Sequence, residues 1–563
     1  MVGRVLAAVY KEVRGLHRAA YVLALFTLGS QILALIRDRL LAHQFGAGIE
    51  LDLYYAAFRV PDLLYVVFAS ALSVYVLIPF VADRMEKSRE TAQALLSQVF
   101  TLFVLFYIVL ALCIGICAPF IVEYVFPGFE AYKTELVLLI RVLLLQPLFL
   151  GISSLFGVIT QLHHRFVLYA LSPLVYNAGI IVGLVFLYPH FGLLGIVFGV
   201  VLGALGHVLI QVPFVGTSGL SPRLSLSIDF PLVFTVFRTS LPRALTLSLH
   251  QIVLLGLVGF ATLMEEGSVA VFQFAFNLQS VPLALIGVSY SVAAFPMLAK
   301  LHAEGKFDEF RIHIMTALRH VIFWSVPVLA LIIVARAQFV RVVLGSGAFD
   351  WDDTRLTAAV LAIFAVALLS QAVNLLLIRA LYAVGNTRIP LYVTLFSSIG
   401  IMGFTFLFLR IYEMYPSFQL FIETLFRVED VPGTEVLMLA LGYTVALTLH
   451  SLVLFILSRK ALTLSRGVTR LQLLRAGTAA FAAATVAYAT LNFFVDGLRT
   501  ETLIGIFLQG LLAVTLGLIG AALTYYLLGS QELKEVYGAL HRRLFRQQEP
   551  AVALPQDEDT LSV

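Results

Sequence analysis

Two long apolar stretches lie within residues 28–80, with Arg37 and Asp38 well inside the first and Arg59 and Asp62 beside Pro61 in the second. A charged group at membrane depth costs about 3 kcal/mol on insertion scales, so a chain retains it where it pairs or faces a wet cavity. The planar guanidinium of arginine matches two phosphate oxygens. We therefore predict that this hairpin forms the wall of a polar cavity, in which Arg37 and Arg59 bind an anionic headgroup and Asp38 orients Arg37. The alternative is a structural ion pair that locks the two helices together.

Five residues of the same hairpin are predicted to shape its backbone. Gly46 and Gly48 belong to the turn FGAG, and Asp52 follows at the start of the second helix, where a carboxylate can cap that helix. Pro61 removes a backbone N–H next to Asp62, which predicts either a hinge or a static kink. These residues are interpreted as structural or hinge positions.

Further polar residues deep in later apolar stretches are predicted to face the same cavity. Asn277 lies four residues after Gln273, so the two amides share a helix face. Arg243 and Arg379 are further candidates for arginines at mid-membrane depth. For the amides, the alternative is an interhelical hydrogen bond worth roughly 1 kcal/mol.

The sequence carries no motif that indicates catalysis. It has no P-loop, no catalytic triad and no histidine or cysteine spacing typical of a metal site. This argues against an ATP-driven pump or a hydrolase, and we expect a transporter that is not an enzyme and holds no metal or cofactor. The net charge of +4 is spread over loops, so no nucleic-acid partner is expected.

The composition places these residues in a membrane protein. Of 563 residues, 60% are hydrophobic and only 12% are charged, against about 25% charged in soluble domains. A membrane-spanning helix needs about 20 apolar residues, which predicts an all-α polytopic protein with about fourteen spans. The predicted spans are residues 20–43, 52–80, 96–118, 135–160, 167–188, 191–213, 234–262, 268–298, 313–335, 355–384, 389–410, 434–458, 473–495 and 503–529.

Loop charge and internal similarity suggest how the spans are organised. Lysine and arginine favour alternate loops, which predicts an even number of spans with both termini cytoplasmic. The segments QLHHRFVLYALSPL and YAVGNTRIPLYVTL resemble each other, which predicts two six-helix lobes related by a parallel repeat, with a substrate site between them. The predicted divisions are a basic interfacial segment 1–19, an N-lobe 20–213, a cytoplasmic linker 214–233, a C-lobe 234–458, a helix pair 473–529 and a partly disordered cytoplasmic tail 530–563.

Three segments together resemble a known family. RDRLLAHQFGAGIELDLYYAAFRVPDLL, GSGAFDWDDTRLTAAVL and RALYAVGNTRIP are similar to the signatures of the MurJ/MviN family. Members of that family are lipid II flippases of the multidrug/oligosaccharidyl-lipid/polysaccharide exporter superfamily, which has the MATE-like fold. Arg37, Asp38 and Asp52 match the family pattern, and Arg59 stands where the family commonly has a cation. The chain departs from the pattern at positions that are commonly arginine, namely Gln31, Tyr65, Val66 and Asn277.

The resemblance implies a function in cell-wall synthesis and cell shape. Such a protein flips a polyprenyl-pyrophosphate-linked peptidoglycan precursor across the bacterial cytoplasmic (inner) membrane by alternating access. The lipid tail would follow a groove formed with residues 473–529. The expected partners are this precursor, membrane lipids and cell-wall synthesis enzymes. Energy would come from the membrane potential or an ion gradient.

Three other functions are left open by the sequence. The first is export of another polyprenyl-linked glycan or lipid, which the departures at arginine positions favour. The second is a drug/cation antiporter, for which Asp38, Asp52 and Asp62 are the candidate ion carriers. The third is a non-transporting membrane scaffold, which predicts that replacing Arg37 by alanine is tolerated.

Overall fold

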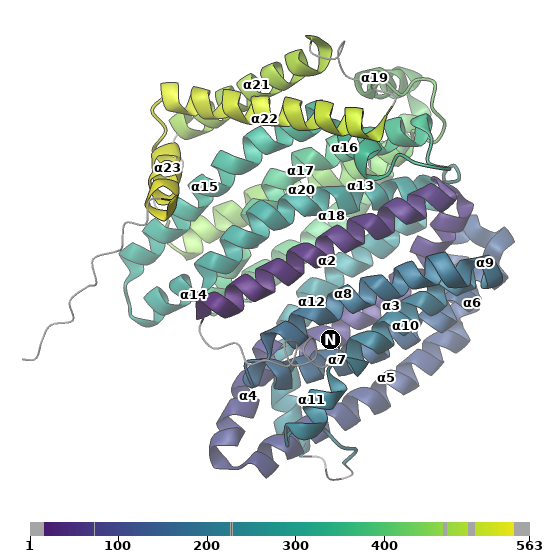
Figure 1. Ribbon diagram of the computed structural model, residues 1–563, viewed down its shortest axis with the longest axis vertical. Coiled ribbons are helices and arrows are strands. Elements are labelled where there is room, and N and C mark those ends of the chain that lie inside the picture. The colour runs from purple at the N-terminus through teal and green to yellow at the C-terminus, as the bar shows by residue number, and fades with distance from the viewer. Residues whose placement is uncertain are drawn as a thin grey trace, which may run out of the picture.

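The protein is an all-helical bundle, as predicted (Figure 1). The computed structural model describes residues 16–72, 74–225, 227, 229–464, 470–493 and 502–544, and every regular element in these ranges is a helix. The first half comprises α2 (Leu16–Phe45), α3 (Ile49–Ala71), α4 (Val74–Lys87), α5 (Arg89–Val125), η1 (Pro127–Tyr132), α6 (Lys133–Leu143), α7 (Leu145–Leu162), α8 (Phe166–Val182), η2 (Gly183–Leu187), α9 (Tyr188–Phe191), α10 (Leu193–Leu209) and α11 (Val212–Thr217). The second half comprises α12 (Phe230–Ala261), α13 (Ser268–Leu283), η3 (Ala284–Val288), α14 (Ser289–Ala303), α15 (Phe307–Val334), α16 (Arg336–Val343), α17 (Trp351–Ala383), α18 (Arg388–Met414), α19 (Pro416–Phe426), α20 (Val436–Ala461), α21 (Arg470–Phe493), α22 (Leu503–Leu527) and α23 (Gln531–Leu544).

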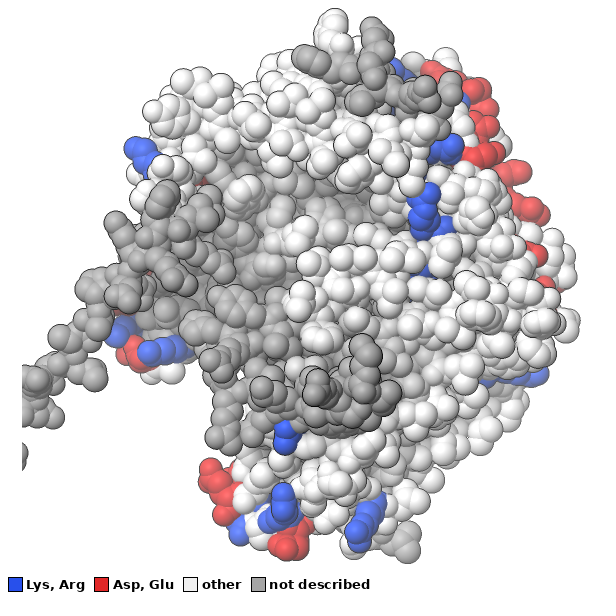
Figure 2. Space-filling view, viewed as in Figure 1, with Lys and Arg blue, Asp and Glu red and all other residues white. Residues whose placement is uncertain are grey.

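Eleven helical stretches of the described chain are long and apolar enough to cross a membrane. Each of the fourteen predicted stretches coincides with helix, but the count of fourteen spans is not confirmed, because 20–43, 52–80 and 473–495 are not among the eleven. Of these, 52–80 contains Asp52, Arg59 and Asp62, which lower its apolarity. Among the described residues visible in Figure 2, the charged side chains lie mostly toward the edges of this face.

The helices form two groups. Those of the first half gather on one side and α13 to α20 on the other, with α2 running between them (Figure 1). Helix α12 packs against both α3 and α18, so it joins the groups. The last two long helices, α21 and α22, pack against each other and against α15. At the N-terminus, α2 already begins at Leu16, inside the predicted segment 1–19, whereas 1–15 and the tail residues 545–563 lie outside the described residues.

Glycines bring α8 and α10 into close contact. Helix α9 ends at Phe191, and Gly192 reverses the chain with φ +58°. A Cβ atom on Gly183 would lie 2.6 Å from the Cα of Gly199, and one on Gly179 would lie 2.3 Å from the Cα of Gly203. Only glycine permits this approach, so these small residues allow the close packing of the two helices.

The loop between the two groups lies against α5. The predicted linker 214–233 is shorter than expected, because α11 extends to Thr217 and α12 begins at Phe230. Polar side chains recur every four residues along one face of α5, and they form hydrogen bonds with the backbone of the loop. The bonds are Arg89 Nη2 to Ser218 O (2.7 Å), Gln93 Nε2 to Ser221 O (2.8 Å), Arg223 N to Ser97 Oγ (3.0 Å) and Ser225 N to Thr101 Oγ1 (2.9 Å).

Candidate functional site

A chain of hydrogen bonds crosses the boundary between the two groups of helices. On the N-lobe side, Arg37 of α2 donates through Nε and Nη2 to Asp38 Oδ1, at 3.0 and 2.7 Å. Its Nη1 donates to Asn177 Oδ1 of α8 at 3.0 Å. The side chain of Asp38 is only 5% exposed and that of Arg37 is 20% exposed. A buried ion pair of this kind needs further hydrogen bonds to offset its desolvation, and Asn177 supplies one.

The chain of hydrogen bonds continues on α13 of the C-lobe and returns to α3. Asn277 Nδ2 donates to Asp38 Oδ2 at 3.0 Å, and Gln273 Nε2 donates to Asn277 Oδ1 at 2.6 Å. Arg59 Nη2 then donates to Gln273 Oε1. We call these six residues, from Asn177 to Arg59, the interlobe chain. It joins both predicted arginines through amides of the opposite lobe.

The interlobe chain keeps unused capacity for hydrogen bonding. Arg59 is buried, and its Nε has no hydrogen-bond partner in the described part of the chain. Asp62 interacts with Arg59 and with the amide of Gln146 on α7. Two arginines therefore face two carboxylates, Asp38 and Asp62. An anion that enters can accept from the unpartnered Nε of Arg59, whereas at Arg37 it must displace the carboxylate of Asp38.

Asp52 caps a helix, but the prediction that it caps its own helix is wrong. Helix α3 has Gly48 at its N-cap, with no side-chain bond there. Asp52 instead accepts from the backbone N–H groups of Gly267 (2.8 Å) and Ala270 (2.7 Å), at the start of α13 in the other lobe. These N–H groups have no partner inside α13, and the positive end of its dipole favours a carboxylate. Asp52 therefore links the two lobes.

The glycine turn lies in the same contact. Gly46 has φ +61°, and a Cβ there would lie 2.7 Å from Ala348 O. Gly267 has φ +90°, and a Cβ there would lie 2.0 Å from Ala47 O. Two backbone N–H groups donate hydrogen bonds across this contact, Ala47 N to the Asp353 carboxylate Oδ2 (3.1 Å) and Ala348 N to His43 O (2.9 Å). We call the contact of residues 43–52 with residues 267–270 and 346–353 the outer contact, because the sequence-based prediction of both termini in the cytoplasm would put these loops outside.

The other predicted residues lie outside the six residues of the interlobe chain as defined above. Helix α3 runs through Pro61 to Ala71, so a hinge at Pro61 and Asp62 stays a prediction. Arg379 is half-buried near the end of α17, and the bonds of the interlobe chain do not include it. Arg243 lies in α12, but its side chain is outside what the structure describes.

Two members of the interlobe chain were missed as site residues. Gln273 carried a usable signal, because it stands one helical turn before Asn277. Asn177 is a single amide in an apolar helix, and nothing in its spacing relates it to Arg37.

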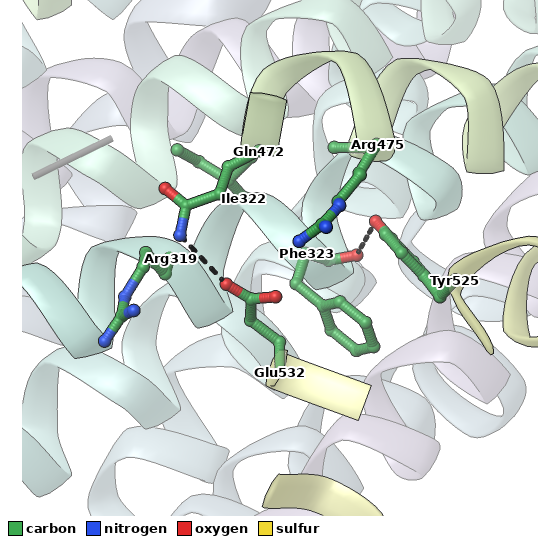
Figure 3. Close-up of a pocket in the computed structure, with 8 residues that line it drawn as sticks. Arg319, Ile322, Phe323, Gln472, Arg475, Tyr525 and Glu532 are labelled. Atoms are coloured by element: carbon green, nitrogen blue, oxygen red, sulfur yellow. Dashed lines mark hydrogen bonds between the residues drawn. The ribbon is translucent and has the colours of Figure 1, made fainter. Parts of the chain in front are cut away.

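A second polar cluster anchors the last helices (Figure 3). Gln472 Nε2 of α21 donates to Glu532 Oε1 of α23 at 3.2 Å, and Tyr525 OH of α22 donates to Phe323 O of α15 at 2.9 Å. The cavity among these residues measures only about 10 Å³, which is too small for a ligand. Beside it, a groove of about 340 Å³ runs between α15 and α22, lined mostly by apolar side chains such as Pro327.

Comparisons with known proteins agree on one family. The family model described as "Lipid II flippase MurJ" matches residues 41–497. A probable lipid II flippase MurJ of Buchnera aphidicola is 27% identical over 66% of this chain and 74% of its own. The lipid II flippase MurJ of Burkholderia cenocepacia is 25% identical over 87% and 93%.

Solved structures share the fold. A lipid II flippase MurJ in an inward closed conformation has a TM-score of 0.71 at 22% identity, covering 90% of this chain and 99% of that one. An inward-facing multidrug resistance MATE family transporter has a TM-score of 0.62 at 16% identity, covering 77% and 94%.

Proposed function

The chain belongs to the lipid II flippase MurJ family, and we propose that it flips lipid II across the cytoplasmic membrane by alternating access. It is a multi-pass membrane protein, with eleven stretches of the described chain able to cross a bilayer. The observation that carries the proposal is the interlobe chain, which holds Arg37 and Arg59 between the two lobes. The multidrug transporters share the fold alone and do not favour an antiporter.

The outer contact supports loading from the cytoplasmic side. Asp52 and the glycine turn hold the outer ends of the lobes together. A headgroup then reaches the arginines from the inner side. Opening the outer contact later releases the headgroup outside, which is the order of events that alternating access requires.

A pyrophosphate is proposed to exchange with Asp38. Arg37 Nε and Nη2, which donate to Asp38 in this structure, would donate to the phosphate oxygens instead. The planar guanidinium group fits either anion. Asp38 also accepts from Asn277 of the other lobe. Binding at Arg37 therefore disturbs a link between the lobes, and each charge-assisted bond involved is worth about 1.5–3 kcal/mol. Substrate binding and lobe movement are coupled through this carboxylate.

The groove between α15 and α22 is proposed to carry the lipid tail. Its lining is almost wholly apolar and comes from α15, α22 and Leu533 of α23. This supports a tail path beside the helix pair predicted for residues 473–529. Coupling to an ion gradient or the membrane potential, contact with cell-wall synthesis enzymes and the cytoplasmic position of both termini remain proposals.

Depletion and complementation test the proposal. A strain depleted of this protein should lose labelled lipid II from the outer leaflet, and the wild-type chain should restore it. Arg37→Ala should fail to restore it at an equal membrane level of protein. A matched control is Arg410→Ala, which removes an exposed arginine paired with Glu413 at 3.0 Å. Unchanged outer-leaflet lipid II during depletion would refute the proposal, and a tolerated Arg37→Ala would favour the scaffold.

A further inference from the structure

Arg141 of α6 is held at membrane depth by a carbonyl of the neighbouring helix. Its Nε donates to Gly115 O of α5 at 2.9 Å. In a regular helix that carbonyl would accept from residue 119, but residue 119 is Pro119 and has no N–H. The arginine thus satisfies a carbonyl that the proline leaves unpaired. The bond also fixes the guanidinium, so it is not free to snorkel toward water.

The position of Arg141 along α6 places it below the membrane surface. Lys133 begins α6 and pairs with Glu123 near the end of α5 at 2.8 Å, which marks the outer end of both helices. Arg141 lies about two turns further, roughly 12 Å from that pair at 1.5 Å per residue. The hydrocarbon half-thickness of a bilayer is about 15 Å. Arg141 therefore lies within the outer leaflet.

The guanidinium opens into a groove that faces lipid. The groove measures about 400 Å³ and lies between α5 and the junction of α6 and α7. Tyr107 OH donates to Leu144 O at 2.5 Å, so this hydroxyl is already engaged. Within the described residues, no carboxylate pairs with Arg141, and neither Nη atom donates to another group. Apart from Tyr107 and Arg141, the lining is Ile108, Ala111, Leu112, Gly115, Ile116, Leu144, Leu145 and Leu148.

We propose that this groove binds one anionic phospholipid of the outer leaflet. The lipid phosphate accepts from the two Nη groups of Arg141, and an acyl chain lies along the apolar lining. The lining offers one cation and no carboxylate. A phospholipid of net negative charge, such as phosphatidylglycerol, meets this cation without bringing an unmatched ammonium group. The site is separate from the interlobe chain, and the proposal does not depend on transport.

Quenching of a local tryptophan by brominated lipids tests the site in the full-length protein. Leu145 lines the groove and is 46% exposed, so Leu145→Trp provides a reporter once Trp324 and Trp351 are changed to phenylalanine. Nanodiscs of phosphatidylcholine then receive a minor fraction of brominated phosphatidylglycerol or brominated phosphatidylcholine. We expect about tenfold preference for the anionic lipid, as one charge-assisted contact provides. The preference should disappear in Arg141→Leu.

A second variant separates lipid binding from folding. Arg141→Leu alone leaves Gly115 O unpaired, whereas adding Pro119→Ala restores an N–H for that carbonyl. The double variant should be as thermally stable as the wild type and still show no preference for the anionic lipid. Pro119→Ala alone should retain that preference. Equal quenching by both lipids in the protein with Arg141, or a preference that persists in the double variant, would overturn the proposal. So would displacement of the brominated lipid by a smaller fraction of a polyprenyl diphosphate, because the occupant would then be the transported lipid.

Discussion

Replacing Asp52 by asparagine should open the outer side of the protein. The Asp52 carboxylate is buried and accepts two backbone N–H groups at the start of α13, at 2.8 and 2.7 Å. These bonds exist only while the outer contact is closed. In an open state the same N–H groups and the carboxylate meet water. The substitution therefore acts on the closed state far more than on the open one.

The magnitude follows from the bonds that are lost. Asparagine keeps one acceptor oxygen, so one N–H retains a partner and the other faces an amide NH₂ group. The loss of one charge-assisted bond and of the favourable interaction with the α13 dipole totals about 2 kcal/mol. That energy corresponds to a change of roughly 30-fold in the ratio of closed to open molecules.

Spin-label distances measure this ratio directly. Labels replace Glu130 of η1 and Asp352 of α17, which are exposed and belong to opposite lobes, after Cys113 and Cys117 are changed to alanine. Asp52→Asn should add a population at longer distance. Glu50→Gln is the matched control, because Glu50 lies in the same turn of α3 and accepts from Tyr188 OH of its own lobe at 3.2 Å.

Two results would refute the reasoning. One is a distance distribution in Asp52→Asn that is identical to that of the wild type. The other is an equal opening in Glu50→Gln, which would show that any lost carboxylate in this turn loosens the lobes. Loss of lipid II flipping without a change in distance would assign Asp52 a role other than closing the outer contact.

Three other predictions concern stability and local order. Gly199→Leu should lower the free energy of unfolding, measured by thermal unfolding, by about 3 kcal/mol, because a Cβ there would lie 2.4 Å from Gly183 Cα. The control Gly216→Leu should leave this free energy nearly unchanged, because the space around Gly216 is open. Burial alone would raise the pKa of Glu423, but hydrogen bonds from Gln419, Tyr412 and Thr434 outweigh it and hold the pKa below its ordinary value of 4.5. The Glu423 carboxylate therefore stabilises the fold fully above about pH 4.5, and this stabilisation is lost as the pH falls through the lower pKa of the folded state. Glu423→Gln should lower the free energy of unfolding by about 1–2 kcal/mol at pH 7. It should also remove this part of the acid dependence when unfolding is measured across pH. Ser97→Ala removes the acceptor of the Arg223 amide and should speed its hydrogen exchange about fivefold, as a bond worth about 1 kcal/mol implies.

The sequence alone determined the class of fold and several local features. Hydropathy fixed helices in all fourteen predicted stretches, because an apolar run in lipid must satisfy its backbone internally. Short-range sequence was enough to predict the turn at FGAG, where Gly46 has φ +61°. The rule that polar and charged groups in a membrane must find partners drew attention to Arg37, Asp38, Arg59 and Asn277, which the interlobe chain brings together.

Only the tertiary structure decided which partner each polar group has. Spacing tells which residues share a face of one helix, but it does not tell which other helix lies against that face. Asp52 was expected to cap α3, and packing instead presents it with the free N–H groups of α13. In the same way, Asn177 reaches Arg37 from a helix far along the chain. Hydrogen bonds act over about 3 Å, so the packing of the helices selects among groups that the sequence leaves equivalent.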